Sequence, residues 1–272
     1  MCLLPRHRDA DGLFRIDEVI GVLRSFGNCE LHALDLAVEG VALRAVVRGD
    51  RGTRVLADIA AVVGREDVHE RGIDIALANL RRIVEPAQRD GFFVRIDMEN
   101  SPYTEATLNV LETVWGLGYR DVGTVVQSCL TRSPGDVDRL NALGARVRLV
   151  KGAYREPASV AHQRMGDVDD AYVALAQRLL DHNPYPAFAT HDPAMVDAVK
   201  AYARERGLGA ERYEFQMLYG IRRDLQTSLV AEGYRVRVYV PFGRQWFPYF
   251  MRRLGERPAN VGFVLKGILR DR

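Results

Sequence analysis

Lysine is almost absent from this sequence. Only Lys151, Lys200 and Lys266 are lysines among the 38 basic residues, so the other 35 are arginines. The first 150 residues contain no lysine at all. A reaction that needs a lysine amine in the N-terminal half of the chain is therefore excluded.

Cysteine is also scarce. The three cysteines, Cys2, Cys29 and Cys129, lie far apart, without the close spacing of a metal or dithiol site. A chain of 272 residues can bury a core without disulfides. This pattern excludes a disulfide scaffold and favours a reducing compartment.

Long apolar runs and basic clusters are missing too. No stretch approaches the roughly 18 apolar residues of a membrane span, and the apolar stretch after Met1 is too short for a signal peptide. The net charge of +2 gives no electrostatic basis for nucleic-acid binding. The six histidines are dispersed, so no metal site is predicted. We expect a cytoplasmic globular protein with no nucleic-acid partner.

Short β-branched runs alternate with amphipathic segments from residue 92 onward. Such alternation predicts βαβ units and a parallel sheet. Between the runs lie segments with helical periodicity, such as TEATLNVLETVWGLG and PAMVDAVKAYARERG. The predicted strands lie within 92–99, 122–130, 147–154, 185–192, 213–220 and 236–243.

Polar or reactive side chains follow nearly every predicted strand. A (β/α)8 barrel gathers its site from the C-terminal ends of many strands, and a single barrel has roughly 250 residues. No Gly-x-Gly-x-x-Gly motif follows an early strand, which disfavours a dinucleotide-binding open sheet. The predicted fold class is α/β, a (β/α)8 barrel of TIM type. Its N-terminal third is expected to allow a distorted or incomplete arrangement of strands. Candidates for the two missing strands are 30–40 and 41–49, which leave little space for a crossover helix.

The segment RLVKGAY (148–154) carries the densest set of functional groups. A glycine at Gly152 lets backbone N–H groups approach a phosphate or a ring oxygen closely. Lys151 is either a ligand-binding residue or a solvated loop lysine. Arg148 points to the barrel interior if the strand alternates as expected, where it needs either a bound anion or an ion pair with Asp97 or Glu99.

Two further segments allow both a functional and a structural interpretation. Thr190 and His191 follow an apolar run and can hold a cofactor, or can be satisfied structural residues. Arg252 and Arg253 are adjacent on a predicted C-terminal helix, with Glu256 three or four residues further on. If Glu256 holds the two guanidinium groups in place, they can bind the carboxylate of a small ligand. The alternative is that both are surface arginines.

Taken together, these segments resemble one family. The segments FFVRIDMEN, VGTVVQS, RLVKGAYREP, FATHDP, EFQMLYGIRRDLQ, GYRVRVYVPFGRQWFPYFMRRL and ERPANVGFVLKG stand in the order and spacing of the bacterial monofunctional proline dehydrogenases. These are FAD-dependent members of the proline utilisation family. A weaker match begins near GIDIALANLRRIVEPA, so the resemblance covers about residues 73–272. We expect a divergent segment at 1–72 and a proline dehydrogenase-like barrel at 73–272.

The resemblance implies that the protein is a flavoenzyme that oxidises L-proline to Δ1-pyrroline-5-carboxylate. Electrons would pass to a quinone during transient contact with the inner face of the membrane, and a pyrroline-5-carboxylate dehydrogenase would act downstream. Asp97 and Arg148 match catalytic positions beside the flavin. The cofactor-binding matches are Met98, Gln127, Arg148, Lys151, Gly152, Ala153, Thr190 and His191. The substrate-binding matches are Tyr239, Arg252, Arg253 and Glu256.

The N-terminal segment departs from the family pattern. The family's second barrel strand carries a substrate-site lysine, whereas no lysine precedes Lys151 here. Either a divergent paralogue or an altered reading frame explains this difference. The missing lysine bears more on proline binding than on flavin binding. Two other functions stay open: a flavin-binding paralogue that is catalytically weak or inactive, and a Schiff-base aldolase that uses Lys151.

Overall fold

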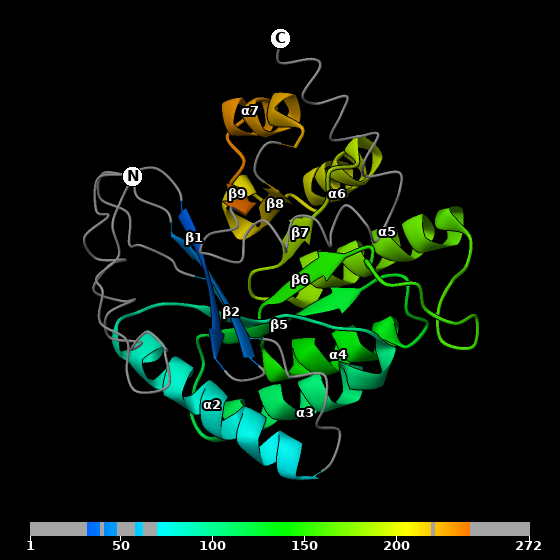
Figure 1. The fold of residues 1–272 in the computed structure, drawn as a ribbon. Coiled ribbons are helices and arrows are strands. Elements are labelled where there is room, and N and C mark those ends of the chain that lie inside the picture. Colours follow the sequence, from blue (N-terminus) through cyan, green and yellow to red (C-terminus); the bar gives the residue numbers. More distant parts are fainter. Residues whose placement is uncertain (1–31, 39–40, 48–57, 62–69, 219–220, 240–272) are drawn as a thin grey trace.

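In the computed structural model of this chain, residues 32–38, 41–47, 58–61, 70–218 and 221–239 are described. Within these ranges one nine-stranded sheet follows the order of the sequence (Figure 1). Its strands are β1 (His32–Val38), β2 (Val41–Val47), β3 (Asp58–Ala61), β4 (Val94–Ile96), β5 (Val122–Gln127), β6 (Val147–Val150), β7 (Ala187–Ala189), β8 (Glu214–Leu218) and β9 (Val236–Tyr239).

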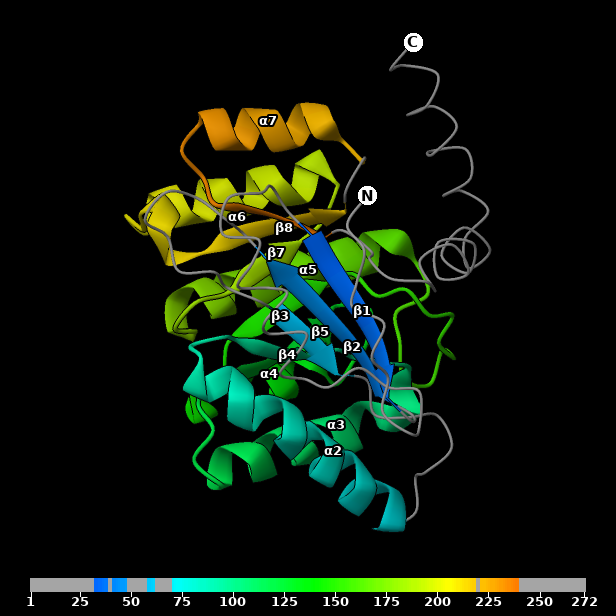
Figure 2. The same ribbon diagram turned by 60° about the vertical axis from the view of Figure 1, so that its left-hand side comes forward.

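The strands from β3 to β9 are parallel, and a helix follows each of them up to β8. The helices cover the outer face of the curled sheet (Figures 1 and 2). They are α2 (Glu70–Arg89), α3 (Ser101–Gly116), α4 (Ser133–Leu143), α5 (Met165–His182), α6 (Pro193–Glu205) and α7 (Arg223–Ala231), with a short 3₁₀ turn at Ala210–Arg212. The repeated strand–helix unit confirms the predicted α/β class from β4 onward.

The N-terminal strands differ from the expected barrel units. The two candidate segments do form strands, but β1 and β2 make an antiparallel hairpin, and β2 is also antiparallel to β3. Only residues 39–40 separate β1 from β2, whereas a parallel crossover needs a dozen or more residues. The strand next to β4 is β3, at 58–61, which the sequence pattern did not predict. The departure therefore lies in the N-terminal third, as expected.

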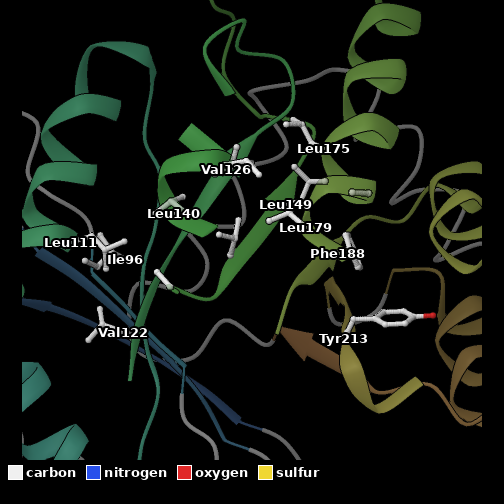
Figure 3. Packing of buried hydrophobic residues seen from close by; sticks show 14 of the residues in the cluster. Ile96, Leu111, Val122, Val126, Leu140, Leu149, Leu175, Leu179, Phe188 and Tyr213 are labelled. Carbon is white, nitrogen blue, oxygen red and sulfur yellow. The ribbon is translucent and has the colours of Figure 1, made fainter. Parts of the chain in front are cut away.

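The core lies between the sheet and the outer helices (Figure 3). Alternate strand residues point outward, so Ile96, Leu149 and Phe188 are fully buried against helical side chains such as Leu111 and Leu175. Burying large apolar side chains on this face is the main stabilising contribution to the parallel part of the sheet.

The inner face of the sheet is polar instead. Glu214 of β8 accepts two hydrogen bonds from Arg237 of β9, at 2.7 and 2.9 Å, and one from Gln216 at 2.6 Å. Burial alone raises the pKa of Glu214, but Arg237, Gln216 and Arg95 together outweigh this effect and the pKa is lowered. The carboxylate is thus kept charged inside the curled sheet, and this polar inner face leads to the candidate site.

Candidate functional site

A cavity of about 380 Å³ opens at the C-terminal ends of β4 to β7. Parallel strands end at the same edge of a sheet, so residues far apart in the sequence meet there. The cavity is lined by Asp97, Met98, Val125, Gln127, Arg148, Val150, Lys151, Gly152, Ala153, Tyr154, Ala189, Thr190, His191 and Asp192. All nine residues predicted for catalysis or cofactor binding within the described ranges are in this lining.

Arg148 and Asp97 form an ion pair across the cavity floor. Only 17% of the Arg148 side chain and 12% of the Asp97 side chain are exposed. The ion pair that the sequence left as one alternative for Arg148 is therefore present. Both residues also line the cavity, so a paired guanidinium still faces a bound ligand.

The loop after β6 passes so close to its neighbours that residue 152 must be glycine. Gly152 has a φ angle of 116°, which side-chain-bearing residues rarely adopt. A Cβ atom there would collide with the Cys129 sulfur and lie 3.3 Å from Gln127 Oε1. The backbone N–H of Cys129 donates to the Lys151 carbonyl at 2.9 Å and holds this approach in place.

Lys151 lies between two carboxylates. Its Nζ is 2.5 Å from Asp169 Oδ1 of α5 and 2.7 Å from Asp192 Oδ2, the residue that caps α6. Burial alone lowers the pKa of Lys151, but the two carboxylates outweigh this effect and the pKa is raised. The side chain therefore stays a protonated ammonium, which cannot attack a carbonyl. This geometry disfavours the Schiff-base aldolase.

His191 is neutral at the edge of the cavity. Burial, with a smaller contribution from the positive charge of Arg222, lowers the pKa of His191 to about 4. Its Nε2 accepts a hydrogen bond from the backbone N–H of Leu218 at 2.8 Å, so the proton is on Nδ1. The neighbouring Thr190 accepts at 3.1 Å from the backbone N–H of Asp192. Both residues thus have structural partners, and they line the cavity as well.

Two contacts clamp the loop after β6 to the loop after β4. The Tyr154 hydroxyl donates to the carboxylate of Glu99. The buried carboxylate of Glu156 accepts from the Ser101 backbone N–H at 2.8 Å and from its hydroxyl at 2.6 Å, at the start of α3. A carboxylate at a helix N-terminus is stabilised by the helix dipole. The cavity is therefore preformed by contacts within the chain.

The substrate-binding predictions fall largely on undescribed positions. Arg252, Arg253 and Glu256 lie outside the described residues. Tyr239 is described: it is half-buried at the end of β9, opposite Leu218 of β8, on the same inner face as Arg237. The roles assigned to these four residues stay predictions.

The strand-end pattern missed two residues that shape the cavity. Asp169 belongs to α5, and Arg222 precedes α7 with a φ angle of 52° and donates to the His191 carbonyl at 3.3 Å. Neither follows a strand directly, so no periodicity or spacing marked them. In the described part of the chain, no group of three or more potential ligands could hold a metal ion. None of the described helices is long and apolar enough to cross a membrane.

Comparison with known proteins gives one consistent result. Residues 41–266 match the model of a family described as proline dehydrogenase, which extends further toward the N-terminus than the resemblance from residue 73. The chain is 48% identical over 202 residues to a proline dehydrogenase of Deinococcus radiodurans, and 42% identical over 196 residues to proline dehydrogenase 2 of Bacillus subtilis. These matches cover 74% and 72% of this chain.

The chain spans only 65% and 64% of the length of those two relatives. Among solved structures, it is similar to proline utilization A of Bdellovibrio bacteriovorus inactivated by N-propargylglycine. The TM-score is 0.71 at 24% identity, and the likeness covers 88% of this chain and 27% of that one. At this identity the structural likeness supports the barrel-like fold alone.

Proposed function

Because this chain belongs to the proline dehydrogenase family, we propose that it is a flavoenzyme that oxidises L-proline to Δ1-pyrroline-5-carboxylate. The observation that carries the proposal is a cavity at the strand ends that is lined by all nine of the described residues predicted for catalysis and cofactor binding. Those residues come from four strand ends that meet at one edge of the sheet.

The cavity fits the chemistry of a flavin such as FAD. Gly152 provides a stretch of backbone without a side chain, and Gln127, Arg148, Lys151 and Thr190 provide side-chain donors beside it. Met98 and Ala153 add apolar contact surface. Ligand sites of this kind combine apolar walls with a few placed polar groups.

When bound, FAD would supply the acceptor for the hydride that leaves the proline carbon next to the ring nitrogen. The protein's part is to bind, orient and exclude water. Arg148 would stabilise the negative charge that a reduced ring gains, and Asp97 would hold that guanidinium in place. The neutral His191 would add no charge of its own.

Proline itself would be held by the residues that the family resemblance assigns. Tyr239 would pack against the proline ring, Arg252 and Arg253 would grip its carboxylate, and Glu256 would brace the two arginines. We further propose a quinone as electron acceptor, reached by transient contact with the inner face of the membrane. A pyrroline-5-carboxylate dehydrogenase would use the product. Residues 1–72 and 73–272 would be a divergent segment and the barrel, respectively.

One spectrum tests the proposal directly. The purified chain should be yellow, and its flavin absorbance should bleach when L-proline is added without oxygen. Acid precipitation should release the flavin, because the proposal assigns it hydrogen bonds and packing contacts and no covalent bond. A colourless protein would contradict FAD binding. Inactivation by borohydride with a carbonyl substrate would instead indicate an aldolase.

A flavin-binding paralogue with weak activity remains the second candidate. The relatives, which are named proline dehydrogenases, do not favour it; the segment that bears on it is the antiparallel β1–β2 hairpin, which contains no lysine. A yellow protein whose flavin stays oxidised with proline would support this candidate.

The two arginines give the matching substrate test. Arg252→Met or Arg253→Met should raise the proline concentration for half-maximal rate while flavin content stays unchanged. Losing one charge-assisted contact costs about 2–3 kcal/mol, or roughly 30- to 150-fold. Unchanged proline affinity in both variants would show that the substrate binds elsewhere.

A further inference from the structure

We propose that the N-terminal end of the parallel sheet carries a second binding site, which takes the phosphate group of a small molecule. Arg146 and Arg235 would bind that group, and both guanidiniums lie against the ring of Tyr185. The site is at the end of the strands opposite to the candidate cavity, and none of these three residues lines that cavity. The inference does not rest on the proposed function.

The three residues stand at the starts of three parallel strands. Arg146 directly precedes β6, Tyr185 lies two residues before β7, and Arg235 directly precedes β9. Residues two apart along a strand point to the same face of the sheet. Arg146 therefore shares the inner face with Arg148, and Arg235 shares it with Arg237. Because parallel strands begin at one edge, residues far apart in the sequence meet there.

Arg146 is held in place by two aromatic rings. Its Cζ lies 5.0 Å from the centroid of Phe93 and 5.6 Å from that of Tyr185. The Phe93 ring needs a glycine beside it, because a Cβ atom at Gly123 would collide with the Arg146 carbonyl oxygen and lie 2.8 Å from the ring. Glycine inside a strand often marks such a close approach. Packing thus fixes the guanidinium before any ligand binds.

Neither guanidinium forms an ion pair with a carboxylate of the described residues. Arg146 makes its two ring contacts there, and Arg235 donates one hydrogen bond to the Tyr185 hydroxyl at 3.3 Å. The buried carboxylate of Glu214 accepts instead from Arg237, at 2.7 and 2.9 Å. Stacking on a ring uses the flat face of a guanidinium and leaves its N–H groups for another acceptor. Two positive charges with available donors therefore face this end of the sheet.

These donors suit a phosphate group better than a carboxylate. The two Cζ atoms lie 5.6 and 5.8 Å from the centroid of the same ring, so one small molecule can reach both. A guanidinium can donate two parallel hydrogen bonds to a phosphate, and a tetrahedral phosphate presents oxygens in several directions. A carboxylate presents its two oxygens in one plane. Arg146 is half-buried and Arg235 is exposed, so a ligand can enter from solvent.

Calorimetric titration of the full-length chain tests the inference. Pyrophosphate, which carries two phosphate groups, should bind with a Kd of about 1 mM or lower. Succinate, a dicarboxylate of similar size, should bind more weakly. The absence of pyrophosphate binding up to about 10 mM would overturn the proposal. Tighter binding of succinate than of pyrophosphate would also overturn it, because the site would then prefer carboxylates.

Two charge-removing variants locate the site. Arg146→Gln and Arg235→Gln should each raise the Kd for pyrophosphate by roughly 10-fold or more, because each removes charge-assisted hydrogen bonds. Arg235 is exposed, so Arg235→Gln carries the test if Arg146→Gln does not fold. The matched control is Arg164→Gln, which removes the same charge from an 83% exposed side chain before α5 and should leave the Kd unchanged. Equal losses in all three variants would mean non-specific attraction and overturn the proposal.

A charge-preserving variant tests whether the guanidinium itself matters. Arg146→Lys keeps the positive charge but loses the planar group that stacks on Phe93 and Tyr185 and donates in pairs. Its Kd for pyrophosphate should fall between those of the wild-type chain and Arg146→Gln. A wild-type Kd in Arg146→Lys would show that the charge alone attracts the anion, and the proposed geometry would be wrong.

The candidate cavity must be excluded as the place where pyrophosphate binds, because FAD itself contains a pyrophosphate. The titration is repeated on protein that has been loaded with FAD and freed of unbound FAD, and the Kd should not change. Lys151→Gln, a change in the cavity lining, should leave the Kd for pyrophosphate unchanged as well, whether or not the chain binds a flavin. Loss of pyrophosphate binding in either experiment would place the anion in the cavity and overturn this inference, while the proposed function would stand.

Discussion

The parallel part of the sheet, β3 to β9, and the N-terminal hairpin, β1 and β2, show how connection length sets strand direction. In the parallel part, strands of three to six residues are joined through helices. In the hairpin, two strands of seven residues are joined by residues 39–40. Two residues can only turn the chain back on itself, whereas a parallel neighbour needs a long crossover.

Strand direction also decides which residues can reach the cavity. The C-terminal ends of β4 to β7 meet at one edge, so their following residues form a common lining. Because β2 is antiparallel to β3, its C-terminal end lies at the opposite edge. The parallel part can therefore build a shared site from consecutive strand ends, whereas in the hairpin only β1 has its C-terminal end at that edge.

The largest expected effect is in the core of the parallel part. Phe188 is fully buried and packs edge-on against Tyr213, with ring centroids 5.8 Å apart. Phe188→Ala should lower the free energy of unfolding by about 3–5 kcal/mol, measured by urea titration. The control Val230→Ala changes a side chain at a 58% exposed position and should cost less than about 0.5 kcal/mol. Equal effects would show that this core does not dominate stability.

Acid pH should lower the free energy of unfolding through His191, which lies at the edge of the cavity. Its pKa of about 4 lies below the ordinary value of 6.5, so the unfolded chain takes up this proton more readily. The contribution of the neutral His191 side chain to the free energy of unfolding is fully present above pH 6.5. It is lost as the pH falls toward 4, and the total loss is up to about 3 kcal/mol. His191→Gln keeps an acceptor for the Leu218 N–H and should flatten the decline between pH 7 and 4.5. An unchanged pH profile would exclude His191 as its cause.

A proline in the hairpin tests whether the two regions unfold together. Ala45 of β2 lies opposite Leu34 of β1 and Ile59 of β3, so β2 is an interior strand. Ala45→Pro should cost about 1–3 kcal/mol, because proline cannot donate to the ladder and leaves a partner unsatisfied. Ala45→Val, which suits a strand, is the control. If the urea midpoint of the whole chain did not move, the hairpin would not belong to the same cooperative unit.

The smallest expected effect lies outside the parallel sheet. Arg178 of α5 and Asp138 of α4 form an ion pair at 2.9 Å, with 48% and 62% of the side chains exposed. Solvent screens such pairs, so Arg178→Ala should cost less than about 1 kcal/mol in the free energy of unfolding. A loss of several kcal/mol would mean that the outer helices depend on charge as much as on the apolar core.

Much of the parallel part could be predicted from the sequence. All six predicted runs contain the observed strands, because short β-branched segments bounded by turn residues are local signals. The nine strand-end residues lie together because the barrel rule places all such ends at one mouth. The strand at β3 was missed, since four residues carry little periodicity. Arg252, Arg253 and Glu256 lie outside the described residues, so their prediction is untested.

The sequence by itself determined the strand–helix order of residues 92–239, the family, and which residues stand at the strand ends. These properties depend on local pattern and chain order. Only the tertiary structure decided that β1 and β2 pair antiparallel, that Asp97 neutralises Arg148, and that Asp169 and Asp192 enclose Lys151. Each of these depends on which elements face one another, and a carboxylate on α5 has no local signature that links it to a lysine after β6. Charge balance at the cavity is therefore a property of the fold.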